Sequence, residues 1–205
     1  MPAVPPGDLH DRRGQRLYLT AAERAAFLIA ARQGPREVRT FCHVLHFTGC
    51  RISEALALTA AGVDLAAQCI VFETLKKRRR GVFRAVPVPA AVLDTLDLVH
   101  GVRDAQKRPD AAHRRLWPWC RMTAWRRLAE VFEAAGVAPG PHRCPKGLRH
   151  GFGVQAISAG VPLNLLARWM GHASLEVTAI YANALGEEQR AIAARMWNSG
   201  EGGRV

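Results

Sequence analysis

Apolar residues recur at helical spacing along most of the chain, which predicts a mainly helical protein. The first helix is expected to begin near Thr20, because Thr20 and Glu23 have the spacing of a capping box, and to end at Gly34-Pro35. Residues 101–115 are polar and are expected to form an internal loop. The other predicted helices cover about residues 36–47, 51–56, 90–99, 123–135, 148–159, 162–170, 174–181 and 187–197, two of them starting at the capping residues Thr123 and Ser174.

Two stretches break the helical pattern. Residues 69–74 and 82–88 are rich in β-forming side chains and are joined by a polar segment that ends in Gly81, which predicts a β-hairpin. The tip of this hairpin carries five successive positive charges, Lys76, Lys77, Arg78, Arg79 and Arg80. The expected fold class is therefore mainly α with a small antiparallel β-sheet.

Composition places the chain among ordinary folded proteins. Of its 205 residues 49% are hydrophobic, which is enough for a core without disulfides or metal, and no apolar run is long enough to cross a membrane. Five cysteines without a C-x-x-C pair favour reduced thiols, of which Cys42 and Cys69 are expected in the core. Because residues 1–16 lack the apolar stretch of a signal peptide, a cytoplasmic protein is expected.

The formal net charge of +12 favours a polyanionic partner, usually nucleic acid. The alternative is a soluble protein that is rich in arginine and has no such partner. Net charge does not distinguish the two, so the sequence motifs have to. Four of them stand out: Thr48–Glu54 (TGCRISE), the basic hairpin with Lys76, Lys146–His150 (KGLRH), and Gly171-His172 with Tyr181 nine residues after the histidine.

These four motifs, in this order and at these separations, resemble the tyrosine recombinase (phage integrase) family over roughly residues 17–197. The resemblance implies a compact helical catalytic domain with a small sheet. It also implies double-stranded DNA as the partner, no cofactor or metal, and a covalent 3′-phosphotyrosine intermediate. The activity it implies is site-specific DNA recombination, as in the integration or excision of a mobile element.

Chemistry explains why these residue types occur together. Attack on a phosphodiester builds negative charge on its non-bridging oxygens, which the guanidinium groups of Arg51 and Arg149 can bind with paired hydrogen bonds. Tyr181 is the expected nucleophile, and the packed aromatic residue is the alternative. An imidazole at His172 can donate to a phosphate oxygen or orient the tyrosine.

The departing 5′ oxygen needs a proton, which a hairpin lysine can supply as general acid. Lys76 matches the family position best and Lys77 is the close alternative. The other hairpin cations, Arg78, Arg79 and Arg80, are expected to bind DNA phosphates together with Lys77, and the tip as a whole could be only such a patch.

One position departs from the family pattern. The family usually has histidine three residues before the second arginine, and here that residue is Lys146. A lysine can bind the phosphate but is a poorer base near neutral pH unless its pKa is depressed, so the sequence does not assign the usual proton-acceptor role to this position. His150, which follows the arginine, is expected to pack or hydrogen-bond internally.

Other candidates receive structural interpretations. Glu54 and Asp64 match family positions and are expected to order Arg51 and the hairpin. His43 and His46, with nearby cysteines, lack the spacing of zinc motifs, so no metal site is expected. Trp117 and Trp119 flank Pro118 and could stack on DNA bases, but packing in the core or in a loop is the commoner role of such residues.

The expected organisation is a disordered tail over residues 1–16, a catalytic domain over 17–198 and a flexible tail over 199–205. Family members usually carry an N-terminal DNA-clamping domain, which is expected to be absent, so DNA binding should be weak. The segment 187–197 is expected to join protomers into an oligomer on DNA. Two other functions stay open: a non-catalytic DNA-binding remnant of a recombinase and a topoisomerase-like nicking and rejoining enzyme.

Overall fold

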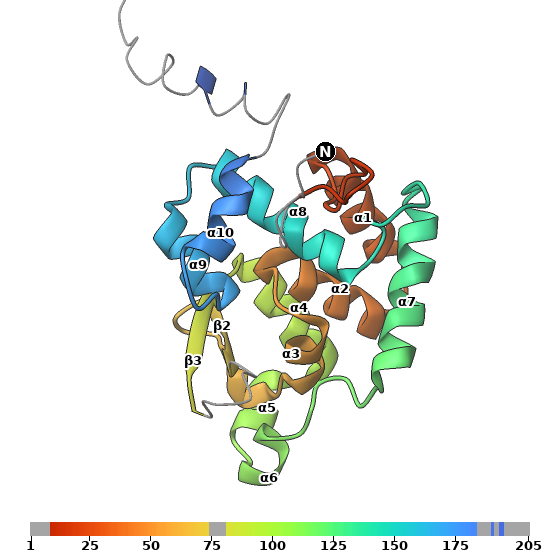
Figure 1. Ribbon diagram of the computed structural model, residues 1–205. Coiled ribbons are helices and arrows are strands. Elements are labelled where there is room, and N and C mark those ends of the chain that lie inside the picture. Colours follow the sequence, from red (N-terminus) through yellow and green to blue (C-terminus); the bar gives the residue numbers. More distant parts are fainter. Residues whose placement is uncertain (1–8, 74–80, 184–189, 191–192, 195–205) are drawn as a thin grey trace, which may run out of the picture.

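The computed structural model describes residues 9–73, 81–183, 190, 193 and 194. The described part consists mainly of helices, with a small sheet at one edge (Figure 1). The helices are α1 (Ala21–Gln33), α2 (Arg36–Thr48), α3 (Ile52–Ala57), α4 (Ala90–His100), α5 (Val102–Gln106), α6 (Pro109–Ala112), α7 (Arg121–Ala134), α8 (Pro145–Ser158), α9 (Leu163–Met170) and α10 (Glu176–Ala179). Two short 3-10 turns, η1 (Ala60–Gly62) and η2 (Ile180–Asn183), also occur among the described residues.

The capping box predicted at the first helix is confirmed. The backbone N–H of Glu23 donates to Thr20 Oγ1 at 3.2 Å, and the N–H of Thr20 donates to Glu23 Oε2 at 2.8 Å. Together these bonds satisfy two of the amide donors that a helix N-terminus leaves free, so α1 starts where its sequence indicates.

The predicted hairpin is also confirmed in its two strands. β2 (Cys69–Glu73) pairs antiparallel with β3 (Phe83–Pro87), and a two-residue strand, β1 (Val63–Asp64), adds to the other edge of β2. Sequence reasoning missed β1 because two residues carry no readable alternation. The hairpin tip with Lys76, Lys77 and Arg78 to Arg80 falls within residues 74–80, outside the described residues.

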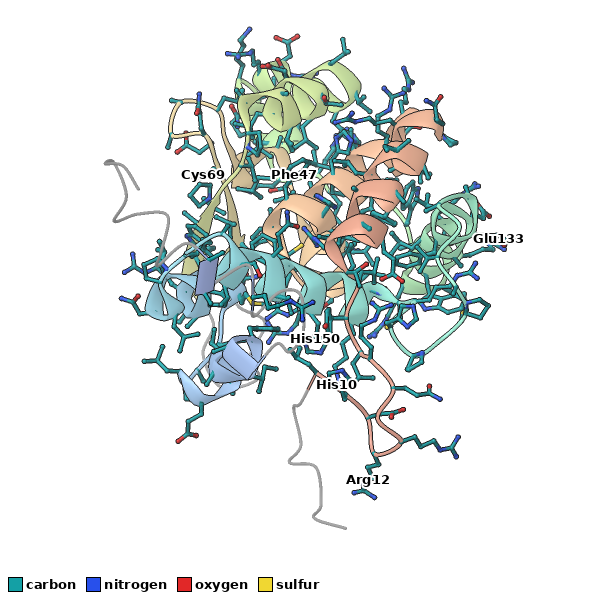
Figure 2. All side chains as sticks on the ribbon, turned by 90° about the horizontal axis from the view of Figure 1, so that it is seen from above. His10, Arg12, Phe47, Cys69, Glu133 and His150 are labelled. Atoms are coloured by element: carbon teal, nitrogen blue, oxygen red, sulfur yellow. The ribbon has the colours of Figure 1, made fainter. Side chains whose placement is uncertain are left out.

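Two buried clusters make the core. The larger one surrounds α2, which contacts α1, α3, α4, α7 and α8. A smaller cluster joins α8 and α9 to Tyr181. Helix α8 belongs to both, since Leu148 lies in the first cluster and Val154 in the second. This helix runs across the molecule (Figure 2), so its middle turns lie where the two clusters meet.

Several side chains that were predicted to pack in the core are found there. Trp117 is fully buried and its indole N–H donates to the carbonyl of Glu37 at 2.9 Å, so it packs rather than facing a ligand. Trp119 packs against the core beside Phe41. All five cysteines are free thiols, and Cys42 and Cys69 are buried as expected.

The predicted disorder of residues 1–16 is wrong for residues 9–16. They form a short loop, closed by the side chain of Asp11, which accepts from the N–H groups of Arg13 and Gln15 at 2.8 Å. Arg12 lies at its exposed tip (Figure 2). The loop is fixed because Leu9 is fully buried in the smaller cluster. Residues 1–8 lie outside the described part.

The predicted internal loop over 101–115 is likewise wrong, because α5 and α6 form there. Val102 and Ala112 are buried, and Gln106 Nε2 donates to the carbonyls of Ala60 and Val63. Single apolar anchors and one long-range hydrogen-bonding side chain hold these short helices in place. Such features leave no periodic signal in a window this short.

Three helix starts differ from the prediction. Helix α7 begins two residues before Thr123 and α8 begins three residues before Leu148, because cysteines cap them: Cys120 Sγ accepts from the N–H of Thr123, and Cys144 Sγ accepts from that of Gly147. Cysteine is not among the favoured N-cap residues, so the pattern did not indicate it. Helix α10 follows Leu175 without a side-chain cap, so Ser174 does not cap it.

The predicted segment 187–197 and the tail 199–205 lie outside the described residues, apart from residues 190, 193 and 194. No helix in the described ranges is long and apolar enough to cross a bilayer.

Candidate active site

The first two turns of α8 gather three basic side chains. Pro145 is the first residue of the helix and Cys144 caps it, so Lys146 falls in the first turn. Arg149 and His150 follow three and four residues later, which places all three on one helix face. The early start of α8, which sequence reasoning missed, is what brings Lys146 into register with the other two.

A cavity of about 650 Å³ opens over this face. It is lined by Arg51, Ile52, Ser53, Arg121, Trp125, Cys144, Pro145, Lys146, Arg149, His150, His172, Val177, Ile180 and Tyr181. Five of the six predicted catalytic residues thus share one cavity: Arg51, Lys146, Arg149, His172 and Tyr181. The sixth, Lys76, lies outside the described residues.

Arg149 is buried and fixed by backbone carbonyls. One terminal nitrogen donates to Gly49 O at 2.7 Å, and the other to Met170 O at 2.6 Å. These carbonyls belong to the C-terminal ends of α2 and α9, where the helix dipole is negative and favours a cation. Burial lowers the pKa of Arg149 to about 10, so the guanidinium is still charged at neutral pH.

Arg51 is held by Glu54, as predicted. Glu54 Oε2 accepts from the backbone N–H of Arg51 at 2.7 Å, and Oε1 accepts from its guanidinium at 3.1 Å. The Arg51 side chain is still 43% exposed, so it can reach a ligand in the cavity. Asp64, the other residue given a structural role, accepts from the N–H groups of Ala66 and Ala67 in the turn before β2.

Sequence reasoning missed the second partner of Glu54, which is Arg84 on β3. The two side chains form a buried pair with N–O distances of 2.7 and 3.2 Å, and Arg84 Nε donates to Trp169 O at 2.7 Å. Burial tends to raise the pKa of Glu54, but the hydrogen bonds and charge of Arg84 hold it below its ordinary value. The pair therefore fixes the sheet to α3 and α9. Strand alternation could have indicated it, since Arg84 shares the inward face with Val86.

His172 lies between Arg149 and Thr178. Its Nε2 is 3.0 Å from an Arg149 nitrogen and its Nδ1 is 2.8 Å from Thr178 Oγ1. A guanidinium can only donate, so Nε2 accepts and Nδ1 carries the proton. Burial, together with Arg149 and Arg51, lowers the pKa of His172 to about 3, which keeps the ring neutral. The rings of His172 and Tyr181 are stacked at an interplanar angle of 13°, with their centroids 6.2 Å apart.

Tyr181 lies in η2 with only 1% of its surface exposed. Its hydroxyl is 3.1 Å from Nδ1 of His150. Burial raises the pKa of Tyr181 to about 12, although the positive charges of Arg149 and Arg51 act in the opposite direction. The expectation that His150 hydrogen-bonds internally is confirmed, and the partner is the residue singled out as nucleophile. The helical spacing of four residues from Lys146 was the available signal.

Gly153 gives the Tyr181 ring its place. A Cβ added at Gly153 would lie 2.6 Å from two ring carbons of Tyr181. Gly153→Ala should therefore lower the free energy of unfolding by about 1–3 kcal/mol through overpacking, despite the better helix propensity of alanine. Denaturant unfolding measures this. Gly34→Ala is the control, because its methyl group would meet only Ala31 O at 3.5 Å; equal stability of both variants and wild type would contradict the packing described.

Among the residues that the structure describes, no three His, Cys, Asp or Glu side chains gather as a metal-binding group. His43 and His46 are buried on α2, and burial lowers the pKa of both. Two neutral imidazoles in the core fit a role in packing.

Comparison with known proteins gives consistent matches. Residues 18–188 match the family model described as Phage integrase family. The tyrosine recombinase XerD of Mycobacterium leprae is 32% identical over 155 residues, covering 70% of this chain and 46% of that protein. The type 1 fimbriae regulatory protein FimB of Escherichia coli K12 is 27% identical, covering 82% of this chain and 84% of FimB. The chain thus spans about half the length of the XerD relative.

Solved structures show the same fold. XerA recombinase superposes with a TM-score of 0.71 at 21% identity, covering 98% of this chain and 68% of XerA. The catalytic domain of bacteriophage HP1 integrase superposes with a TM-score of 0.62 at 19% identity, covering 91% of this chain and 98% of that domain. The expected fold class, mainly helical with a small antiparallel sheet, is confirmed.

Proposed function

The chain belongs to the phage integrase family, and from this premise we propose that it cleaves and rejoins DNA strands through a covalent 3′-phosphotyrosine link to Tyr181. One observation carries the proposal: a single cavity holds the phenol of Tyr181 together with the cations Arg51, Lys146 and Arg149. A phosphodiester in this cavity would have its developing negative charge facing preorganised donors.

Arg149 is suited to this role by its unused hydrogen-bond donors. A guanidinium has five N–H groups, of which Gly49 O, Met170 O and His172 Nε2 take three. The Nε–H group and one Nη1 N–H group remain, and each can donate to an oxygen of a bound phosphate. Arg51 and Lys146 line the same cavity and add positive charge.

The proposed reaction needs no external energy source. The Tyr181 oxygen attacks the phosphorus, and the bond from phosphorus to the 5′ oxygen breaks. The departing oxygen takes a proton from the hairpin, with Lys76 as the proposed donor and Lys77 as the alternative. The phosphotyrosine ester keeps the bond energy, so a 5′ hydroxyl can later reverse the attack.

The proposed partner is double-stranded DNA. The net charge of +12 and the basic hairpin tip, Lys77 with Arg78, Arg79 and Arg80, support it. XerH, a further structural relative at 20% identity, was solved bound to its difH substrate. We propose that recombination takes place in an oligomer assembled on DNA, joined through residues 187–197.

A nicked suicide duplex tests the proposal. After cleavage such a substrate loses the strand needed for rejoining, so a covalent adduct should accumulate and appear on a denaturing gel. No adduct with any natural site would favour a non-catalytic DNA-binding protein. Relaxation of plasmid DNA without sequence preference would instead favour the topoisomerase-like activity.

Arg149→Lys should lower the rate of adduct formation by about 10²–10³-fold. Lysine keeps the positive charge but has three donors around a single nitrogen, so it cannot hold the two carbonyls and a phosphate in the planar geometry of arginine. Single-turnover cleavage measures the rate, and the exposed Arg126→Lys on α7 is the control. A rate for Arg149→Lys equal to that of the control would show that charge alone suffices.

A further inference from the structure

His150 is in contact with the atom that would react. Its Nδ1 lies 3.1 Å from the Tyr181 hydroxyl, and it is the one hydrogen-bond partner of that hydroxyl among the described residues. His150 is buried, with 8% of its surface exposed, and lies on helix α8; its ring centroid is 5.8 Å from that of Tyr181. A group placed in this way meets the geometric requirement for a general base.

The other candidates for this role either have partners already or lack a lone pair. Both nitrogens of His172 are committed, Nε2 to Arg149 and Nδ1 to Thr178, and its ring stacks on Tyr181 rather than facing the hydroxyl. Glu54 is bound by Arg51 and Arg84. Lys146 lines the cavity, but as an ammonium it has no lone pair with which to accept a proton.

His150 is neutral before DNA binds. Burial, with the charges of Lys146 and Arg149, lowers the pKa of His150 to about 4. A hydrogen bond donated by the Tyr181 hydroxyl to Nδ1 requires the ring proton on Nε2, which is buried and has no hydrogen-bond partner among the described residues; the lone pair of Nδ1 then faces the phenol. Proton transfer is unfavourable in this state, because the phenol pKa is about 12. A phosphate bound beside Lys146 and Arg149 would offset their charges, and the phenol becomes more acidic as its oxygen bonds to phosphorus.

We propose that His150 is the general base of DNA cleavage and takes the proton of Tyr181 during attack. This inference rests on the function proposed above. In the cleavage step the O–P bond to Tyr181 forms, the bond to the 5′ oxygen breaks, and the phenolic proton moves to His150 Nδ1. The departing 5′ oxygen takes its proton from the hairpin lysine. In rejoining, the imidazolium of His150 returns its proton to the leaving phenolate oxygen.

Two variants separate proton transfer from positioning. His150→Asn keeps an oxygen close to the place of Nδ1, so it can accept the hydrogen bond of Tyr181 but cannot take its proton. His150→Ala removes both functions and leaves space that imidazole can enter. The matched control is His142→Asn, which changes another buried histidine, near Glu23 and outside the cavity.

The measurement is the single-turnover rate of adduct formation on a nicked suicide duplex, with DNA binding and the melting temperature recorded for each variant. His150→Asn should cleave at least about 10²-fold more slowly than wild type while binding DNA equally well. His150→Ala should be as slow, and added imidazole should restore its rate at least about tenfold. His142→Asn should cleave at the wild-type rate.

The outcomes distinguish the two proposals. If wild type and His142→Asn form the adduct and His150→Asn stays within a few-fold of them, His150 only positions the tyrosine and the inference is wrong. A slow His150→Ala that imidazole leaves unchanged would also overturn it. If wild type itself forms no adduct on any natural site, the proposed function fails, and the role of His150 fails with it.

Discussion

Tyr181→Phe should abolish the covalent adduct, with a loss of about 10⁴-fold or more in cleavage rate. Phenylalanine lacks the oxygen that would bond to phosphorus, and no other group can form the same aryl ester. The ring should keep its stacking on His172 and its packing against Gly153, because both involve ring atoms only. Denaturing gels of the suicide-duplex reaction measure the effect.

Binding provides the control for this variant. The cations Arg51, Lys146 and Arg149 remain, so Tyr181→Phe should shift DNA in a native gel as wild type does. The chain has two tyrosines, and the other, Tyr18, is also buried in the smaller cluster. Persistence of an adduct in Tyr181→Phe and its loss in Tyr18→Phe would transfer the nucleophilic role and contradict the site described.

Glu54→Ala should lower the free energy of unfolding by about 3–5 kcal/mol. The carboxylate is the ion-pair partner of Arg84, whose side chain is only 4% exposed, so its removal leaves a buried charge without its ion-pair partner. The same change frees Arg51 and loosens the contact of β3 with α9, so cleavage should fall as well. Denaturant unfolding followed by circular dichroism measures the stability.

The control is Glu37→Ala, which removes an exposed ion pair with Arg36 and should leave the unfolding midpoint unchanged.

The dependence of stability on acid pH gives an independent check. The folded-state pKa of Glu54 is below its ordinary value of 4.5, so the carboxylate stabilises the fold above that pH and the contribution is lost as the pH falls through the lowered pKa. Wild type should therefore lose more stability below pH 4.5 than Glu54→Ala does. If the free energies of unfolding of wild type and Glu54→Ala fell by the same amount below pH 4.5, this role of the pair would be contradicted.

Local patterns were sufficient for most of the elements. The capping box at Thr20, the glycine that ends α9 and the alternation of β2 and β3 are each decided by neighbours within a few residues, which the sequence displays directly. The misplaced starts of α7 and α8 have a chemical reason, because thiols cap both helices and the usual preference is for oxygen.

The site shows where sequence reasoning stops. The motif spacing indicated Arg51, Arg149, His172 and Tyr181, and the fold brings them to one cavity. It did not indicate that Arg84 completes the binding of Glu54. It also did not indicate that His150, rather than Lys146 or His172, is bonded to the phenol.

The sequence by itself determined which residues were candidates for binding a phosphate and attacking it, and most of the succession of helices that carries them. Tertiary structure alone decided the partners of each group, since Arg149 is bound by the carbonyl of a residue 100 positions earlier and His150 by a hydroxyl 31 positions later. Side-chain periodicity records only which face of an element is buried. Which distant group meets that face, and with which protonation state, depends on how the helices pack.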